Sequence, residues 1–321
     1  MSLLLRKAVV IDVATGLLLV AIMLLIPWEL IRGAEFADLR NYLSRIYLLE
    51  DYGESYFYWE NDLLGWLKFE IIWFKILSLV VDLGVSPDVF FDLITAVSAL
   101  VAHQFLSRYV GGWWALAILV NPISVDLFSS QLRSAFAFSL ILLALMARSQ
   151  AVRVLLFSVA PFVHAGMAFI LAFLFVSWAF VRLVNIGVRV KLFFILVSSV
   201  LIAFFVAKYV PQFASEIGDR RDFALFSTKS VAYVAFWFIW IAFLALSVAE
   251  TLQEDWRIYY TILVGVSASL MDVLGVPGFR FIALSIPILF SAQEFIKKEY
   301  KLTVFGAGAM YLVSLYYFWI K

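Results

Sequence analysis

The sequence contains no cysteine and only two histidines, His103 and His164, among its 321 residues. The absence of cysteine excludes disulfides, a thiol nucleophile and a thiolate metal site. Two histidines give little basis for a dedicated transition-metal site, so we predict neither a metal nor a cofactor. Charged residues make up only 15% of the chain, and the net charge of +1 gives no bias toward nucleic acid.

Apolar residues are correspondingly abundant: 65% of the chain is hydrophobic, 18% is aromatic, and the mean hydropathy is +1.00. Long continuous apolar runs, rather than alternating segments of about 10 residues, indicate membrane-spanning helices and not a β-barrel. We therefore predict an all-α polytopic membrane protein, formed as one integral membrane domain over residues 1–321. It should contain about 9 to 12 transmembrane helices, broken and half-helices included.

The first apolar run, Ala8–Ile31, follows Arg6 and Lys7 and lacks a convincing cleavage site, which predicts a retained signal anchor with a cytoplasmic N-terminus. Residues 32–68 then form the longest polar interval. We expect them to be a periplasmic loop, because they contain seven acidic and only four basic residues. Its apolar residues recur at helical spacing, which predicts an amphipathic helix on the membrane surface.

Aromatic and acidic residues alternate near the end of this loop, including Tyr58, Trp59, Glu60 and Asp62. An interfacial aromatic belt is the simpler interpretation. The alternative is a sugar-binding platform, in which flat rings stack on pyranoses and a carboxylate binds hydroxyls or takes a proton.

The next apolar run, Trp66–Gly84, predicts a second span that contains Glu70 and Lys75. These residues are five apart, so each should find a separate partner. The Val85–Asp88 turn begins a third span that ends near Ser107, where we expect a structural or interfacial role for His103.

Asn121-Pro122 interrupts the apolar run that follows, residues 111–128, which is either one kinked span or two half-helices. We favour two half-helices that form a hairpin, because the hairpin fits both the basic N-terminus and the acidic first loop. The choice decides on which face of the membrane the earlier segments lie.

Arg133 begins one apolar run, and His164 lies at a Pro/Gly break, residues 161–166, in the run after it. The basic residues Arg148 and Arg153 separate the two runs. The chain should therefore leave and return to one membrane face, and the positive-inside rule puts Arg133 and His164 near the outer face. A single long tilted helix with a proline kink is the alternative for the second run.

The second half of the chain predicts five further spans: Lys191–Tyr209, Val231–Glu250, Ile258–Leu274, Phe281–Ala292 and Leu302–Ile320. Residues 210–230 should form a second periplasmic loop. In that loop, Arg220 and Arg221 are either part of a solvated charge cluster or substrate ligands. Arg280 follows a tight outer turn and would join Arg133 and His164 in one outer-face cavity.

Arginine at a membrane–water boundary suits phosphate, because its planar fork donates two charge-assisted hydrogen bonds. A diphosphate carried on a lipid would lie at that depth. The sequence contains no glycine-rich nucleotide loop, DxD-type metal motif or Walker motif, so a transferase of this kind would use lipid-linked donors.

Four short runs together resemble the EpsG family of Wzy-type polysaccharide polymerases, over about residues 50–290: Ser130–Ala137, Ala160–Met167, Phe69–Trp73 and Gly278–Phe281. The resemblance implies a membrane glycosyltransferase with a GT-C-like helix bundle. It would polymerise O-antigen or capsule repeat units linked to undecaprenyl diphosphate, on the periplasmic face of the bacterial inner membrane. Its partners would be that lipid-linked oligosaccharide, the bilayer and a chain-length regulator protein.

Under this resemblance Arg133 and Arg280 would hold the diphosphate, and Gln131 would contact substrate. The base for the acceptor hydroxyl would be His164, or else one of Glu60, Asp62 and Glu70. The alternatives are a flippase or transporter for the same lipid, an O-antigen ligase or another lipid-dependent glycosyltransferase, a membrane acyltransferase, and a purely structural membrane subunit.

Overall fold

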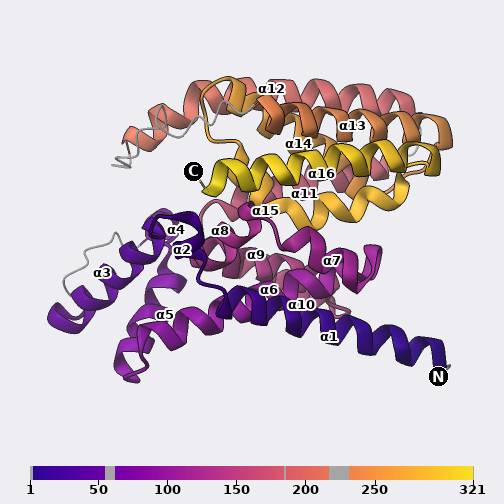
Figure 1. Cartoon of the computed structure of the whole chain (residues 1–321). Helices are drawn as coiled ribbons and strands as arrows, with labels where there is room; N and C mark the ends of the chain where they lie inside the picture. The colour runs from indigo at the N-terminus through magenta and orange to yellow at the C-terminus, as the bar shows by residue number, and fades with distance from the viewer. Residues whose placement is uncertain (1–2, 55–61, 184–185, 217–230, 321) are drawn as a thin grey trace. The chain divides into compact units, whose positions relative to one another are not determined.

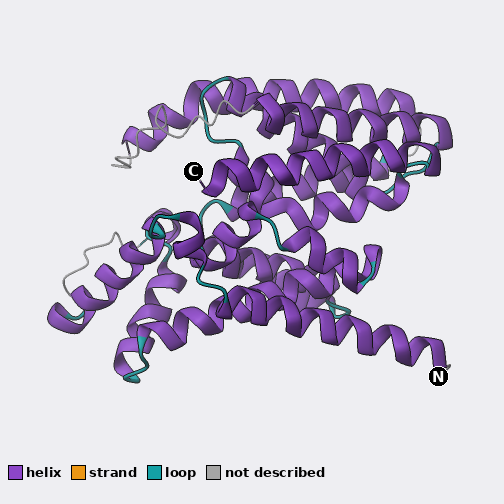
Figure 2. Ribbon diagram, in the orientation of Figure 1, coloured by secondary structure: helices purple, strands orange, loops and turns teal. Residues whose placement is uncertain are grey.

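The computed structural model describes residues 3–54, 62–183, 186–216 and 231–320 (Figure 1). Within these ranges all regular structure is helical, as Figure 2 also shows. The prediction of an all-α polytopic membrane protein is confirmed. Contacts divide the chain into two compact units, formed by residues 1–171 with 319–321 and by residues 172–318.

The helices of the first unit are α1 (Leu3–Leu25), α2 (Trp28–Arg32), α3 (Ala37–Tyr52), α4 (Leu63–Lys68), α5 (Ile71–Asp82), α6 (Pro87–Val110), α7 (Gly112–Leu119), α8 (Pro122–Ser129), α9 (Leu132–Met146) and α10 (Gln150–Val163). Helix α11 (Met167–Arg182) contains the boundary between the units. The second unit continues with α12 (Val188–Glu216), α13 (Val231–Thr251), α14 (Trp256–Val273), α15 (Phe279–Ser291), η3 (Ala292–Phe295) and α16 (Lys298–Ile320).

Three segments in the described part of the chain are long and apolar enough to cross a bilayer: Pro87–Val110, Val188–Tyr209 and Tyr233–Thr251. The α7–α8 pair qualifies as a fourth if it is one broken span. Shorter apolar helices of 10–17 residues include α9, α10 and α11. The predicted total of 9 to 12 counted such short and broken helices together with full spans.

The predicted interruption at Asn121-Pro122 is confirmed, since α7 and α8 meet at an angle of 80°. The Asn121 side chain accepts hydrogen bonds from the backbone N–H groups of Ile123 and Ser124, at 2.9 and 3.1 Å, and so begins α8. This bend is intermediate between a kinked span and a closed hairpin.

Helix α6 is the centre of the first unit, packed against α1 on one side and α9 on the other, while α9 also packs on α10. His103 is fully buried on α6, and its Nε2 lies 3.2 Å from the carbonyl oxygen of Gly112. A Cβ on Gly16 would lie 3.2 Å from the His103 ring, so glycine allows α1 to approach closely. These contacts agree with a structural role for His103.

The amphipathic helix predicted in the first loop is present as α3, and both its N-cap residue Phe36 and its residue Ile46 are buried. In the second unit α14 is central, because it packs against α12, α13 and α15. One expectation for the first apolar run is wrong at its end. Helix α1 stops at Leu25, since Pro27 begins a separate short helix, α2.

Candidate functional site around Glu70

The second predicted span, Trp66–Gly84, is not one helix, because the chain breaks at Phe69 and Glu70 between α4 and α5. Glu70 has a φ of 53°, a left-handed conformation that is uncommon for a residue other than glycine. Its side chain is only 10% exposed. The reason for the break lies in the contacts of its carboxylate.

Three groups donate to the Glu70 carboxylate. Arg133 donates from Nη1 to Oε2, His164 donates from Nδ1 to Oε1 at 2.6 Å, and the backbone N–H of Ala165 donates to Oε1 at 3.1 Å. A buried carboxylate is tolerated when it is paired with a cation and fully hydrogen-bonded. The left-handed turn at Glu70 therefore directs an acid toward two segments that come later in the chain.

His164 lies where α10 ends, and the predicted Pro/Gly break is confirmed there. Pro161 remains inside α10, and the chain turns at His164, Ala165 and Gly166 before α11 begins. Because Glu70 is ionised by its pairing with Arg133, its carboxylate accepts a hydrogen bond from Nδ1–H. In the neutral tautomer that donates from Nδ1, the lone pair is on Nε2, the arrangement that a general base requires.

Space beside Nε2 of His164 depends on Gly166. A Cβ at this position would lie 2.9 Å from Nε2, closer than side-chain carbons normally approach. The His164 side chain is 22% exposed.

Arg133 is the second residue of α9, where its positive charge faces the buried acid. Its Nη1 pairs with Glu70, but its Nε is buried and has no hydrogen-bond partner among the described residues. A buried donor without a partner is costly and marks a place where a ligand acceptor can bind. The predicted meeting of Arg133 and His164 is confirmed, since both contact Glu70.

Helix α3 adds two residues that the sequence did not identify, Tyr42 and Arg45. Tyr42 is buried, and its ring packs edge-on against Trp73 of α5 at 5.5 Å. Burial, partly offset by the positive charge of Arg133, raises the pKa of Tyr42 to about 12. Desolvation and then the charge of Arg133 lower the pKa of Arg45, while Glu70 acts in the opposite direction. Arg45 is thus a second cation within electrostatic range of the site.

Several other predicted ligands have local partners. Asp62 caps α4 by accepting from the backbone N–H of Gly65 at 2.6 Å, and Gln131 donates to Asp126 at 2.9 Å. Lys75 pairs with Glu54, which confirms that Glu70 and Lys75 have separate partners. Five predicted ligands lie outside the described residues: Tyr58, Trp59, Glu60, Arg220 and Arg221.

Arg280 is in the first turn of α15, in the second unit. The buried Asp272, 2% exposed, precedes it and accepts a hydrogen bond from the backbone N–H of Phe279 at 3.2 Å. Gly278 allows this turn to pack closely, because a Cβ there would lie 2.0 Å from the carbonyl oxygen of Ala268. The proximity of Arg280 to Arg133 and His164 stays a prediction.

The fold and this site define a polytopic membrane protein with a buried carboxylate that contacts both an arginine and a histidine. The carboxylate orients the imidazole, and the buried Nε of Arg133 has no hydrogen-bond partner among the described residues. Comparison of the chain with protein-family models, curated protein sequences and solved structures finds no match.

Proposed function

We propose that this protein is a membrane glycosyltransferase that joins oligosaccharide repeat units carried on undecaprenyl diphosphate. The observation that carries the proposal is the Glu70 carboxylate shared between His164 and Arg133, which combines an oriented base with an arginine. Glycosyl transfer from a lipid diphosphate needs both groups. The acceptor hydroxyl must lose a proton, and the leaving diphosphate gains charge.

In the proposed reaction, an oxygen of the acceptor sugar attacks the anomeric carbon of the donor glycan. The new glycosidic C–O bond forms as the bond from that carbon to the diphosphate oxygen breaks, and its electron pair leaves with the diphosphate. The acceptor proton moves to Nε2 of His164, whose Nδ1–H stays hydrogen-bonded to Glu70. The step is redox-neutral and needs no nucleotide.

The charges around the site favour an anionic ligand. Arg133 and Arg45 carry two positive charges, and Glu70 carries one negative charge. The Nε of Arg133, which has no partner in the described part of the chain, supplies a donor for a phosphate oxygen. In the proposal Arg280 supplies a further cation for the diphosphate, as the sequence predicts.

The distribution of basic residues supports an outward-facing site. The site lies where α9 begins and α10 ends, whereas Arg148 and Arg153 lie at the other end of this helix pair, near the connection between them. The positive-inside rule assigns that basic connection to the cytoplasm. The proposed site then faces the periplasm from the bacterial inner membrane, within reach of newly flipped lipid-linked units and a chain-length regulator.

The first test is a gel of surface polysaccharide from cells that lack the protein and carry either the wild-type chain, Arg133→Ala or Arg133→Lys. We expect both variants to reduce the ladder to core plus one repeat unit, because lysine cannot donate the guanidinium fork. Immunoblotting of the membranes checks that each variant is present. Loss of every glycan-bearing band would instead indicate flipping or ligation, and an unchanged ladder would contradict the proposal.

A second variant tests the base without removing any charge. Gly166→Ala places a methyl group against Nε2 of His164 and should also abolish the ladder. Gly306→Ala in α16 is the matched control, because a Cβ there meets no atom within 4 Å. A normal ladder with Gly166→Ala would exclude proton transfer to Nε2.

A further inference from the structure

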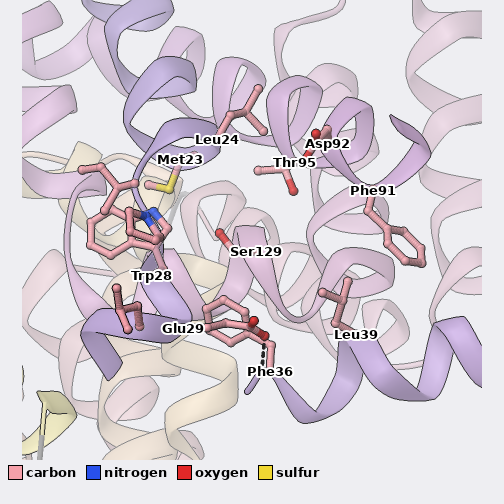
Figure 3. A pocket seen from close by; sticks show the side chains of 13 residues that line it. Met23, Leu24, Trp28, Glu29, Phe36, Leu39, Phe91, Asp92, Thr95 and Ser129 are labelled. Atoms are coloured by element: carbon pink, nitrogen blue, oxygen red, sulfur yellow. Dashed lines mark hydrogen bonds between the residues drawn. The ribbon is translucent and has the colours of Figure 1, made fainter. Parts of the chain in front are cut away.

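A separate cavity of about 430 Å³ lies in the first unit, between the end of α1, α2, the start of α3 and the first turns of α6 (Figure 3). This volume is within the range of small-molecule pockets. The cavity does not include Glu70, Arg133 or His164. We call it the α1–α6 pocket.

Three aromatic rings form the inner wall of the α1–α6 pocket. Trp28, Phe36 and Phe91 line it, and their exposed fractions are only 7%, 4% and 5%. The indole N–H of Trp28 already donates to the carbonyl oxygen of Ile22 at 3.2 Å, which fixes that ring. Because neighbouring side chains cover most of each ring, the three rings contribute apolar edges to the wall of the pocket.

Two carboxylates, from Glu29 and Asp92, lie among the same lining residues and are exposed to solvent. Glu29 accepts one hydrogen bond, from the backbone N–H of Phe36 at 2.7 Å, and has acceptor capacity left. Figure 3 shows both acids as sticks, with the Ser129 hydroxyl in the same pocket. The Ser129 Oγ is buried and has no hydrogen-bond partner within the described part of the chain.

The combination of aromatic rings, two carboxylates and a hydroxyl favours some classes of ligand over others. An acyl chain would fit the rings but would leave two carboxylates and a hydroxyl without partners when it displaced water. An anion would be repelled, because no lysine or arginine is among the lining residues. A pyranose satisfies both parts, since its C–H groups can contact the apolar ring edges and its hydroxyls can donate to the carboxylates.

We propose that the α1–α6 pocket binds a neutral sugar residue of a membrane-bound glycoside. The pocket begins at the end of α1, where a glycoside held by its lipid tail can present its sugar. The inference goes beyond the proposed function, because it concerns binding at a second place and can be measured without turnover.

The test uses the purified full-length chain in phospholipid nanodiscs and a photoreactive octyl glucoside with a diazirine next to the sugar. After irradiation, peptide mass spectrometry locates the label. We expect labelling within residues 23–39 and 89–95, competed by unlabelled octyl glucoside and not by an octyl oligoethylene glycol, which has no sugar. Competition by octylamine but not by octyl glucoside would overturn the proposal in favour of a cationic ligand.

Variants in the pocket make the test specific. The double variant Glu29→Gln, Asp92→Asn loses both charged acceptors and should reduce labelling about tenfold. The single variant Ser129→Ala should also reduce labelling. Glu35→Gln is the matched control, since Glu35 pairs with Arg40 and does not line the pocket. Undiminished labelling of the double variant would overturn the proposal.

The experiment also separates this inference from the polymerase proposal. Arg133→Ala should label like the wild-type chain, because Arg133 does not line the pocket. If Arg133→Ala is labelled like the wild-type chain and also produces a normal polysaccharide ladder, only the polymerase proposal is contradicted. Loss of labelling with Arg133→Ala would contradict a distinct sugar site.

Discussion

The two units each contain a deeply buried carboxylate, and the protein satisfies the two acids in different ways. Glu70 in the first unit is 7% exposed and pairs with an arginine, a histidine and a backbone N–H. Asp272 in the second unit is 2% exposed and accepts from the backbone N–H of Phe279. The first acid holds side chains that can react, whereas the second holds a turn, so burial alone does not identify a site.

The largest expected effect comes from replacing Glu70, the buried acid that pairs with an arginine. Glu70→Ala should abolish the polysaccharide ladder and lower the free energy of unfolding by about 3 kcal/mol, because Arg133, whose side chain is only 19% exposed, is left without its partner. Thermal unfolding of the purified protein in detergent measures the second effect. The double variant Glu70→Ala, Arg133→Met should recover much of the stability but none of the activity. If Glu70→Ala alone is as stable as the wild-type chain, the pair is not buried as described.

The next largest loss of stability is expected at Gly278, because the turn before Arg280 is closely packed there. Gly278→Ala places a Cβ 2.0 Å from the carbonyl oxygen of Ala268, which requires the backbone to move. We expect a loss of about 1–3 kcal/mol in the free energy of unfolding. Gly275→Ala is the comparison, because its Cβ meets no atom within 4 Å and only its φ of +85° opposes alanine. A larger loss at Gly275 would show that backbone conformation, not packing, limits this turn.

Asp272→Ala should have a smaller effect than either, about 1–2 kcal/mol, because the backbone N–H of Phe279 loses its acceptor. Asp272→Asn keeps an acceptor oxygen and should be closer to the wild-type stability. Thermal unfolding of the two variants side by side tests this assignment. Equal, large losses for both would mean that the charge of Asp272, and not its hydrogen bond, is required.

The smallest effect is expected at the exposed pair formed by Glu54 and Lys75. The hydrogen bond from Lys75, followed by one from Ser78, lowers the pKa of Glu54. The stability that this lowering contributes is present above the ordinary pKa of the carboxyl and is lost as the pH falls through the lowered value. Glu54→Gln should change the free energy of unfolding at neutral pH by less than about 0.5 kcal/mol. A loss of activity at neutral pH would assign Glu54 to the site instead.

The sequence predicted helices well where apolar runs end in local signals. Ser86 and Pro87 mark the start of α6, and Asn121-Pro122 marks the bend before α8, because capping and the missing proline N–H act within a few residues. The placement of Arg133 and His164 at the same end of their helix pair was also predictable, from the basic turn between the two helices. Each of these features has a signal that lies nearby in the sequence, and this made it predictable.

The break at Glu70 could not be predicted in this way. Its partners Arg133 and His164 are 63 and 94 residues away, and no local signal interrupts the apolar run around it. Tyr42 was missed for a related reason. Its helix reads as an amphipathic surface helix, and only the spacing of Leu39, Tyr42 and Ile46 on one face hinted that this tyrosine is buried.

The left-handed backbone at Glu70 has a consequence for how this chain can change. Glycine or asparagine would suit a φ of 53° better, and would relieve on the order of 1 kcal/mol of conformational strain. Either residue would also remove the carboxylate that orients His164. Selection for a more stable fold and selection for the proposed reaction therefore oppose each other at this one position. Libraries selected only for stability should enrich glycine or asparagine at position 70, whereas those selected for a full polysaccharide ladder should retain glutamate.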